Sequence, residues 1–182
     1  MAVWNLDPAH TVATFSARHM MVTTVRGSFA PPSGTLEFDP EKPALSSVEA
    51  TLDATTVSTG LADRDNHLKS PDFLDVANYP TITFKSTRVQ LEDADNALVT
   101  GDLTIRGVTK QITLKVEKLG IVNDPWGGRR VGFTAETKIN REDWGLTWNV
   151  AIEAGGVLVG KEIKLNIEAE AILVQTTEAA PA

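Results

Sequence analysis

Polar and apolar residues alternate along much of the chain with a period of two. The segment SSVEATLDAT at 46–55 places Val48, Ala50, Leu52 and Ala54 on one face and polar side chains on the other. The same alternation recurs in KQITLKVEKL (110–119), RVGFTAETKI (130–139) and EIKLNIEAEAIL (162–173). This pattern is typical of β-strands that have one buried face and one solvated face.

Weaker alternation marks four further segments at 11–18, 24–38, 81–91 and 97–106. Turn signals separate the runs: APPSG, DPEKP, EDADN, RGVTK and NDPWGG. IRGVTKQI predicts a tight hairpin that joins two strands. About eight antiparallel strands result, which should either close into a barrel or stack as a sandwich. The long strand at 162–174 favours an extended barrel, because most strands have only about 5–6 residues.

Helix is scarce, and RDNHLKSPDF at 64–73 contains the best candidate. Asp63 is the expected N-cap and Pro71 the expected stop, which leaves two turns at most. The stretch is dense in charge, so an active site, a metal site and a piece of scaffold are all open interpretations. Its position between two β-rich halves favours a plug or side wall of the barrel, with His67 turned toward the cavity or the wall.

The apolar face carries many small side chains. They are Ala13, Ala17, Ala50, Ala54, Gly101, Ala135, Ala169 and Ala171. Protein interiors fill to crystal-like density, and a filled barrel would need bulkier residues at these positions. The pattern therefore favours a hollow barrel with an elongated apolar cavity. A two-sheet sandwich, in which small residues let the sheets approach, is the alternative.

Length and composition predict one domain at 1–175 followed by a disordered tail at 176–182. The net charge of −7 argues against nucleic acid and anionic membranes as partners. No apolar run approaches about 18 residues, so we expect no stable membrane insertion. No secretory signal is visible at the start, which predicts a cytoplasmic location, or a periplasmic one if a signal was removed.

Motifs for catalysis or metal binding are weak. Cysteine is absent, and His10, His19 and His67 show no zinc-ligand spacing, so we expect no metal site. We expect His10 to satisfy backbone groups of a turn between two strands. His19 lies either at a barrel mouth or in a packed corner. Trp126 is expected to anchor a loop in the core, whereas Trp144 and Trp148 could form a lid or a core anchor.

Four blocks resemble, in order, the YceI-like family of polyisoprenoid-binding, lipocalin-like barrel proteins. The blocks are WNLDPAHTVATFSARHMMVTTVRGSF, RDNHLKSPDFLDVANYPTITF, GDLTIRGVTKQITL and GFTAETKINREDWGLTWN. The resemblance implies an all-β fold, an extended eight-stranded antiparallel lipocalin-like β-barrel with one short helix. It also implies an apolar tunnel for a polyisoprenoid, isoprenoid quinone, fatty acid or amide, frequent homodimers and no established catalysis. Its motif cores include Arg18, His19, His67 and Arg141.

Three hypotheses follow. In the first, the protein is not an enzyme and carries or stores a long-chain amphiphile, such as a polyprenyl quinone, without a further cofactor. The ligand-binding residues would be Phe15, Ala17, Arg18, His19, Ala50, Leu52, His67, Phe73, Phe84, Leu103, Ile105, Phe133, Ala135, Arg141, Trp144, Trp148 and Ile167. In the second, His67 or His19 is a general base on an amphiphilic substrate in the same cavity. In the third, a filled barrel is an interaction module with an exposed apolar patch.

Overall fold

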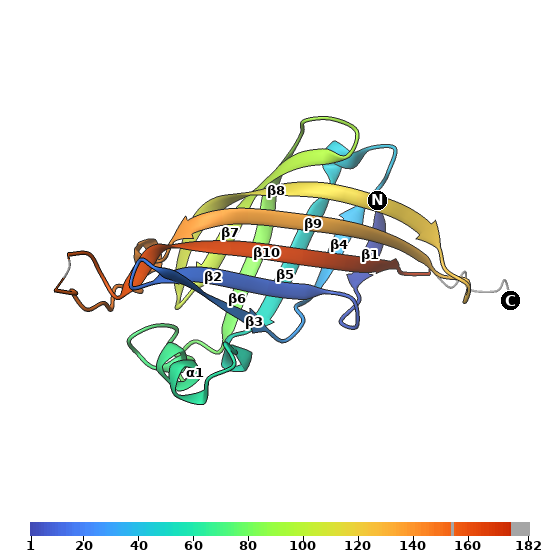
Figure 1. Cartoon of the computed structure of the whole chain (residues 1–182). Helices are drawn as coiled ribbons and strands as arrows, with labels where there is room; N and C mark the ends of the chain where they lie inside the picture. Colours follow the sequence, from blue (N-terminus) through green and yellow to red (C-terminus); the bar gives the residue numbers. More distant parts are fainter. Residues whose placement is uncertain (154, 176–182) are drawn as a thin grey trace, which may run out of the picture.

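A computed structural model describes residues 1–153 and 155–175 of the chain (Figure 1). One helix, α1 (Ala62–Lys69), accompanies the strands. The strands are β1 (Ala2–Leu6), β2 (Val12–His19), β3 (Thr23–Phe29), β4 (Ser33–Phe38), β5 (Ser47–Asp53), β6 (Thr81–Leu91), β7 (Asn96–Ile105), β8 (Val108–Asn123), β9 (Arg129–Asn140) and β10 (Val159–Leu173). Three short 3₁₀ helices are η1 (Pro43–Leu45), η2 (Ala54–Thr56) and η3 (Arg141–Trp144).

The strands form one antiparallel sheet that closes on itself. Its order runs from β1 through β4–β10, and β10 pairs back to β1. One edge of β10 pairs with β9, while the other pairs with β2 over Val159–Glu168 and with β1 over Ala171–Leu173. The pair β1 and β2 therefore fills one strand position, and β3 and β4 fill the next. The ten segments make eight positions, which confirms the predicted eight-stranded antiparallel barrel over the sandwich.

Local sequence explains both interruptions. Between β3 and β4, Pro31 and Pro32 have no N–H to donate, so the ladder breaks there. Between β1 and β2, the chain makes a turn in which Asp7 Oδ1 accepts the backbone N–H of Ala9 at 3.0 Å. Asp7, and not His10 as expected, thus satisfies this turn. The Asp7 N–H still reaches the Glu170 carbonyl at 2.8 Å, which keeps the turn on β10.

The predicted tight hairpin at IRGVTKQI is confirmed. Strand β7 ends at Ile105 and β8 begins at Val108, so the turn consists of Arg106 and Gly107. Both have positive φ values, 50° and 71°. Two-residue loops of this kind twist in the sense that antiparallel strands need.

Helix α1 forms where it was expected, but its start differs. Leu61 is the N-cap and makes no side-chain cap, while Asp63 lies in the first turn. A carboxylate there still interacts favourably with the helix dipole. The helix ends at Lys69, with Ser70 as its C-cap before Pro71. It lies beside the lower end of the barrel in Figure 1, outside the ring of strands. It is part of the end closure and does not plug the barrel axis.

Two hydrophobic clusters pack at separate places inside the barrel. The first, the helix-side cluster, is built around Phe73, Leu103, Trp144 and Leu146 near α1 and η3. The second, the terminal cluster, is formed by Trp4, Phe38, Val131 and Ala171. Trp4 Nε1 donates to the Phe38 carbonyl at 3.0 Å, so its one polar group is satisfied in the second cluster. Among the described helices, none is long and apolar enough to cross a membrane.

Some of the small inward residues are in close contact with aromatic rings from neighbouring strands. A Cβ at Gly101 would lie 2.5 Å from Phe84 Cζ and 2.5 Å from the carbonyl oxygen of Lys85. A Cβ at Gly27 would lie 2.3 Å from Phe15 Cζ. These two glycines therefore let the aromatic rings approach the neighbouring strands closely, and the rings fill the space that the missing side chains leave.

The Gly101→Ala variant should be less stable by about 1–3 kcal/mol, because the new methyl group collides with backbone as well as with a ring. Urea denaturation followed by tryptophan fluorescence measures this change. Gly132→Ala is the matched control, since a Cβ there meets Leu119 Cβ only at 3.7 Å, an ordinary contact. Equal unfolding midpoints for the two variants would contradict the role given to Gly101.

Candidate functional site

An apolar cavity occupies the barrel between the two clusters. Its volume is about 270 Å³, and every strand from β1 to β10 contributes an apolar side chain to its wall. Ile82 and Leu103 of the helix-side cluster bound one side, and Phe38 of the terminal cluster bounds the other. The described part of the barrel is thus hollow rather than filled, as the small inward residues predicted.

The structure brings many of the predicted ligand-binding residues together around this cavity. They are Phe15, Ala50, Leu52, Phe84, Leu103, Phe133, Ala135 and Ile167. Their side chains come from six strands and face inward through the period-two alternation. Contact of these residues with a ligand remains a prediction.

The other predicted residues lie outside the cavity lining. They are Ala17, Arg18, His19, His67, Phe73, Ile105, Arg141, Trp144 and Trp148. Phe73, Ile105 and Trp144 are buried in the helix-side cluster. Trp144 Nε1 donates to the Leu103 carbonyl at 3.0 Å, so this tryptophan is a core anchor. Trp126, in contrast, is 85% exposed at the β8–β9 turn, and its expected burial was wrong.

His67 belongs to an aromatic group beside the helix-side cluster. Its ring centroid lies 4.5 Å from that of Trp148 and 5.0 Å from that of Phe73, both edge-on. Its Nε2 lies 2.9 Å from Asp72 Oδ2, which orients the ring. A histidine oriented by a carboxylate could act as a base, but this one faces Trp148 and Phe73 and does not line the cavity.

Arg141 is buried and donates only to backbone carbonyls. It is 3% exposed. Nε donates to Gly160 at 2.9 Å, Nη1 to Leu146 at 2.6 Å and Nη2 to Val159 at 3.2 Å. Burial lowers the pKa of the guanidinium from its ordinary value. Since the three carbonyls flank the 147–158 connection, Arg141 ties both ends of that connection to η3.

The rim of the cavity consists of polar residues that sequence reasoning missed. Ser46 ends the β4–β5 connection and Ser47 begins β5, Asp95 ends the β6–β7 turn and Asn96 begins β7, and Lys118 comes from β8. Lys118 Nζ lies 3.0 Å from Asp95 Oδ1 and donates to the Ala94 carbonyl at 3.2 Å. The segment EDADN predicts only a turn from its residue types. The one signal in the sequence was that Lys118 continues the inward series Ile112, Leu114, Val116.

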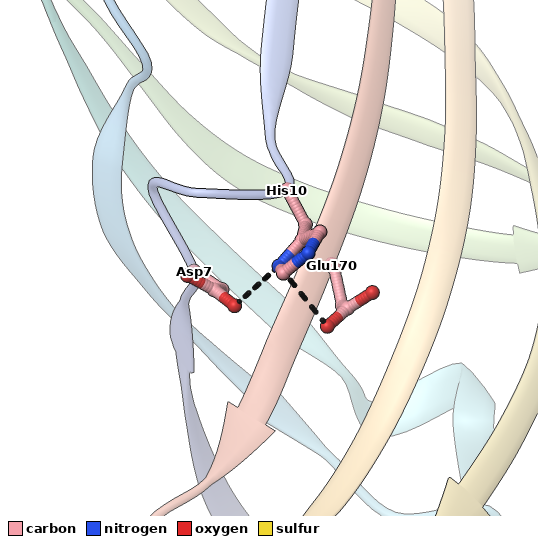
Figure 2. Close-up of side chains that lie close together, drawn as sticks. All are labelled: Asp7, His10 and Glu170. Carbon is pink, nitrogen blue, oxygen red and sulfur yellow. Dashed lines mark hydrogen bonds and ion pairs between the residues drawn. The ribbon is translucent and has the colours of Figure 1, made fainter. Parts of the chain in front are cut away.

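A second polar group lies on the barrel wall at the turn between β1 and β2. Figure 2 shows Asp7 and His10 of the turn pointing toward Glu170 of β10. His10 Nδ1 lies 2.9 Å from Asp7 Oδ2 and 3.7 Å from Glu170 Oε1. Their spacing is one that a metal ion could bridge.

Arg130 of β9 already supplies a cation to these carboxylates. Its Nη1 donates to Asp7 at 2.8 Å and to Glu170, and its Nε donates to Asp124 at 2.7 Å. The hydrogen bonds from His10 and Arg130 lower the pKa of Asp7 to about 2, and the Asp7 carboxylate raises the pKa of His10. A metal ion would have to displace the guanidinium, so we interpret the group as an ion-pair network.

The fold and the cavity together define a hollow antiparallel β-barrel of the lipocalin-like type. A family model described as the YceI-like domain matches residues 4–171. The chain belongs to this family, as the four sequence blocks implied.

Curated relatives and solved structures agree with this assignment. Protein YceI of Escherichia coli is 40% identical over 163 residues, which cover 90% of this chain and 82% of that protein. The crystal structure of a Campylobacter jejuni YceI protein is 32% identical, covers 87% of this chain and 90% of that one, and has a TM-score of 0.76. Burkholderia cenocepacia BcnA shares the fold at 22% identity, with coverage of 91% and 98% and a TM-score of 0.78.

The ion-pair network should make stability depend on pH in a defined direction. His10 has a raised pKa in the folded protein, so its contribution is complete below about pH 6.5 and disappears as pH rises through the folded value. Asp7 has a lowered pKa, so its contribution is lost as pH falls from 3.8 toward about 2. Wild type should therefore exceed His10→Gln in melting temperature most near pH 5.

Differential scanning calorimetry from pH 5 to 9 checks this dependence, with the difference fading by about pH 9. His19→Gln is the control, because His19 makes no ion pair among the described residues. A His10→Gln difference that is constant across this range would show that His10 acts through packing alone.

Arg141→Lys should lower the free energy of unfolding by about 2–4 kcal/mol, since one ammonium cannot replace a buried guanidinium that donates to three separate backbone carbonyls. Arg26→Lys, at an exposed position of β3, should change it by less than about 0.5 kcal/mol. The urea midpoints of unfolding of both variants measure these changes in stability. If Arg141→Lys unfolded at the wild-type midpoint, the tie to the 147–158 connection would be dispensable.

Proposed function

We propose that the protein binds a long-chain amphiphile in the barrel cavity and carries or stores it without chemical change, with an isoprenoid lipid as the favoured ligand. The observation that carries the proposal is the cavity of about 270 Å³, which has apolar walls and a polar rim. Such a site matches a molecule with a long apolar chain and one polar end.

The energetics suit an uncharged apolar chain. Each CH₂ group that leaves water contributes about 0.8 kcal/mol, so about a dozen carbons contribute about 10 kcal/mol before the cost of ordering the ligand. No ion pair inside the cavity is needed for affinity. A further support is a solved polyisoprenoid binding domain from Saccharophagus degradans, which shares this fold at 14% identity with a TM-score of 0.70 and covers 96% of this chain and 100% of that one.

The absence of chemical change belongs to the proposal. The enzyme hypothesis requires a histidine on the inner wall beside the ligand. Among the described residues, the cavity lining includes no histidine, and His67 and His19 both lie elsewhere. The predicted ligand class requires no separate cofactor.

Ala135→Phe should reduce affinity for a short-chain prenyl benzoquinone at least tenfold, because the new ring fills cavity space between Val116 and Ile167. Ala2→Phe is the matched control at an exposed position of β1. Delipidated protein would be titrated in native mass spectrometry, which also counts subunits and so checks the predicted homodimer. Circular dichroism confirms that both variants fold.

Two results would overturn the proposal. One is wild-type protein that takes up neither prenyl quinones nor aliphatic amphiphiles. The other is a folded Ala135→Phe variant that binds with wild-type affinity.

A further inference from the structure

The rim of the cavity brings together three segments that are distant in sequence. In Figure 1 the β4–β5 connection and the β6–β7 hairpin both lie at the top of the barrel, and η1 contacts β6. Ser46 comes from the first segment, Asp93 and Asp95 come from the second, and Lys118 comes from β8. A polar end of a ligand in the cavity would meet these side chains.

The charges at this rim disfavour the binding of an anionic head group. Lys118 is the cation of the lining, and its ammonium is already held by the Asp95 carboxylate at 3.0 Å and by the Ala94 carbonyl at 3.2 Å. The side chain of Lys118 is 28% exposed and that of Asp95 is 58% exposed, so solvent reaches this pair from the Asp95 side. An anionic head group could use Lys118 only by displacing Asp95.

Asp93 adds a second negative charge that no cation compensates among the described residues. Its carboxylate accepts the backbone N–H groups of Asp95 at 2.9 Å and Asn96 at 2.8 Å, together with the Asn96 side-chain amide at 2.9–3.0 Å. These donors hold the pKa of Asp93 below its usual range. The rim thus carries two carboxylates, Asp93 and Asp95, and one ammonium, and this net negative charge disfavours a further anion there.

Ser46 offers what an uncharged head group needs. Its hydroxyl oxygen is buried, and it is the buried side-chain oxygen in the described part of the chain that has no hydrogen-bond partner. Ser46 also lines the cavity. A buried hydroxyl without a partner is unfavourable, and a carbonyl, amide or hydroxyl of a ligand would satisfy it.

We propose that the rim selects amphiphiles with an uncharged hydrogen-bonding head group and discriminates against carboxylates and phosphates, through Ser46, Asp93 and the Asp95–Lys118 pair. This selectivity rests on the proposed function, because it assumes that the chain of the ligand occupies the cavity. Quinones, long-chain alcohols and amides belong to the accepted class. Ionised fatty acids and prenyl phosphates belong to the rejected class.

The test compares laurate, lauramide and dodecanol, which share one chain length, by native mass spectrometry and displacement of a fluorescent probe at pH 8. Wild-type protein should bind dodecanol and lauramide at least tenfold more tightly than laurate. Asp95→Asn frees Lys118 and should raise the ratio of laurate to dodecanol affinity at least tenfold. Lys118→Met should lower the ratio of laurate to dodecanol affinity below the wild-type value. Ser46→Ala should weaken the binding of lauramide several-fold.

Glu162→Gln is the matched control, because it removes one negative charge from a residue outside the cavity lining. Glu162 lies near the start of β10, where its carboxylate is 3.6 Å from the Lys138 ammonium. It should leave the ratio unchanged. Laurate binding as tight as dodecanol binding in wild type, or equal shifts for Asp95→Asn and Glu162→Gln, would overturn the selectivity while leaving the proposed function in place. Failure of all three ligands to bind would instead overturn the proposed function.

Discussion

Closure of the barrel depends on the hydrogen bonding of strand β10 along both of its edges. This strand of 15 residues must hydrogen-bond to β9 along one edge and to two separate strands, β1 and β2, along the other. Only then does the sheet close on itself, because β10 joins β1 to the far end of the strand order. The turn at Asp7–Thr11 interrupts the partner strand without releasing it, because Asp7 and Thr11 both bond to the backbone of Glu170. Closure in turn encloses the cavity.

Much of the barrel could be predicted because strand identity follows from local alternation. Val48, Ala50 and Leu52 face inward in β5 as the period-two pattern requires, and the Arg106–Gly107 turn follows from its two residue types. Whether a small inward residue creates cavity space could not be predicted from its own segment. Ala50 and Ala135 line the cavity, whereas Ala54 and Ala171 pack in the two clusters and Gly101 lies under Phe84. Which outcome a small residue has depends on its neighbours across the sheet.

The rim could not be predicted for a related reason. Ser46, Asp95 and Lys118 come from three segments, and their meeting depends on the curvature of the closed sheet rather than on any motif. The blocks that resembled the family pointed instead to Arg141 and His67, which the structure places against Phe73 of the helix-side cluster. Dense polar motifs there stabilise connections: Arg141 satisfies carbonyls, and His67 packs between Phe73 and Trp148. The stretch RDNHLKSPDF is thus a closure of the barrel end.

The separation of the helix-side cluster from the terminal cluster has a kinetic consequence. The two clusters pack their own side chains on either side of the cavity, so the scaffold does not need an occupant to hold its shape. If a ligand binds in the cavity as proposed, its release through the rim would not require global unfolding, and its residence time would be independent of the lifetime of the fold. Occupancy would raise thermal stability only by mass action, in proportion to the logarithm of free guest concentration.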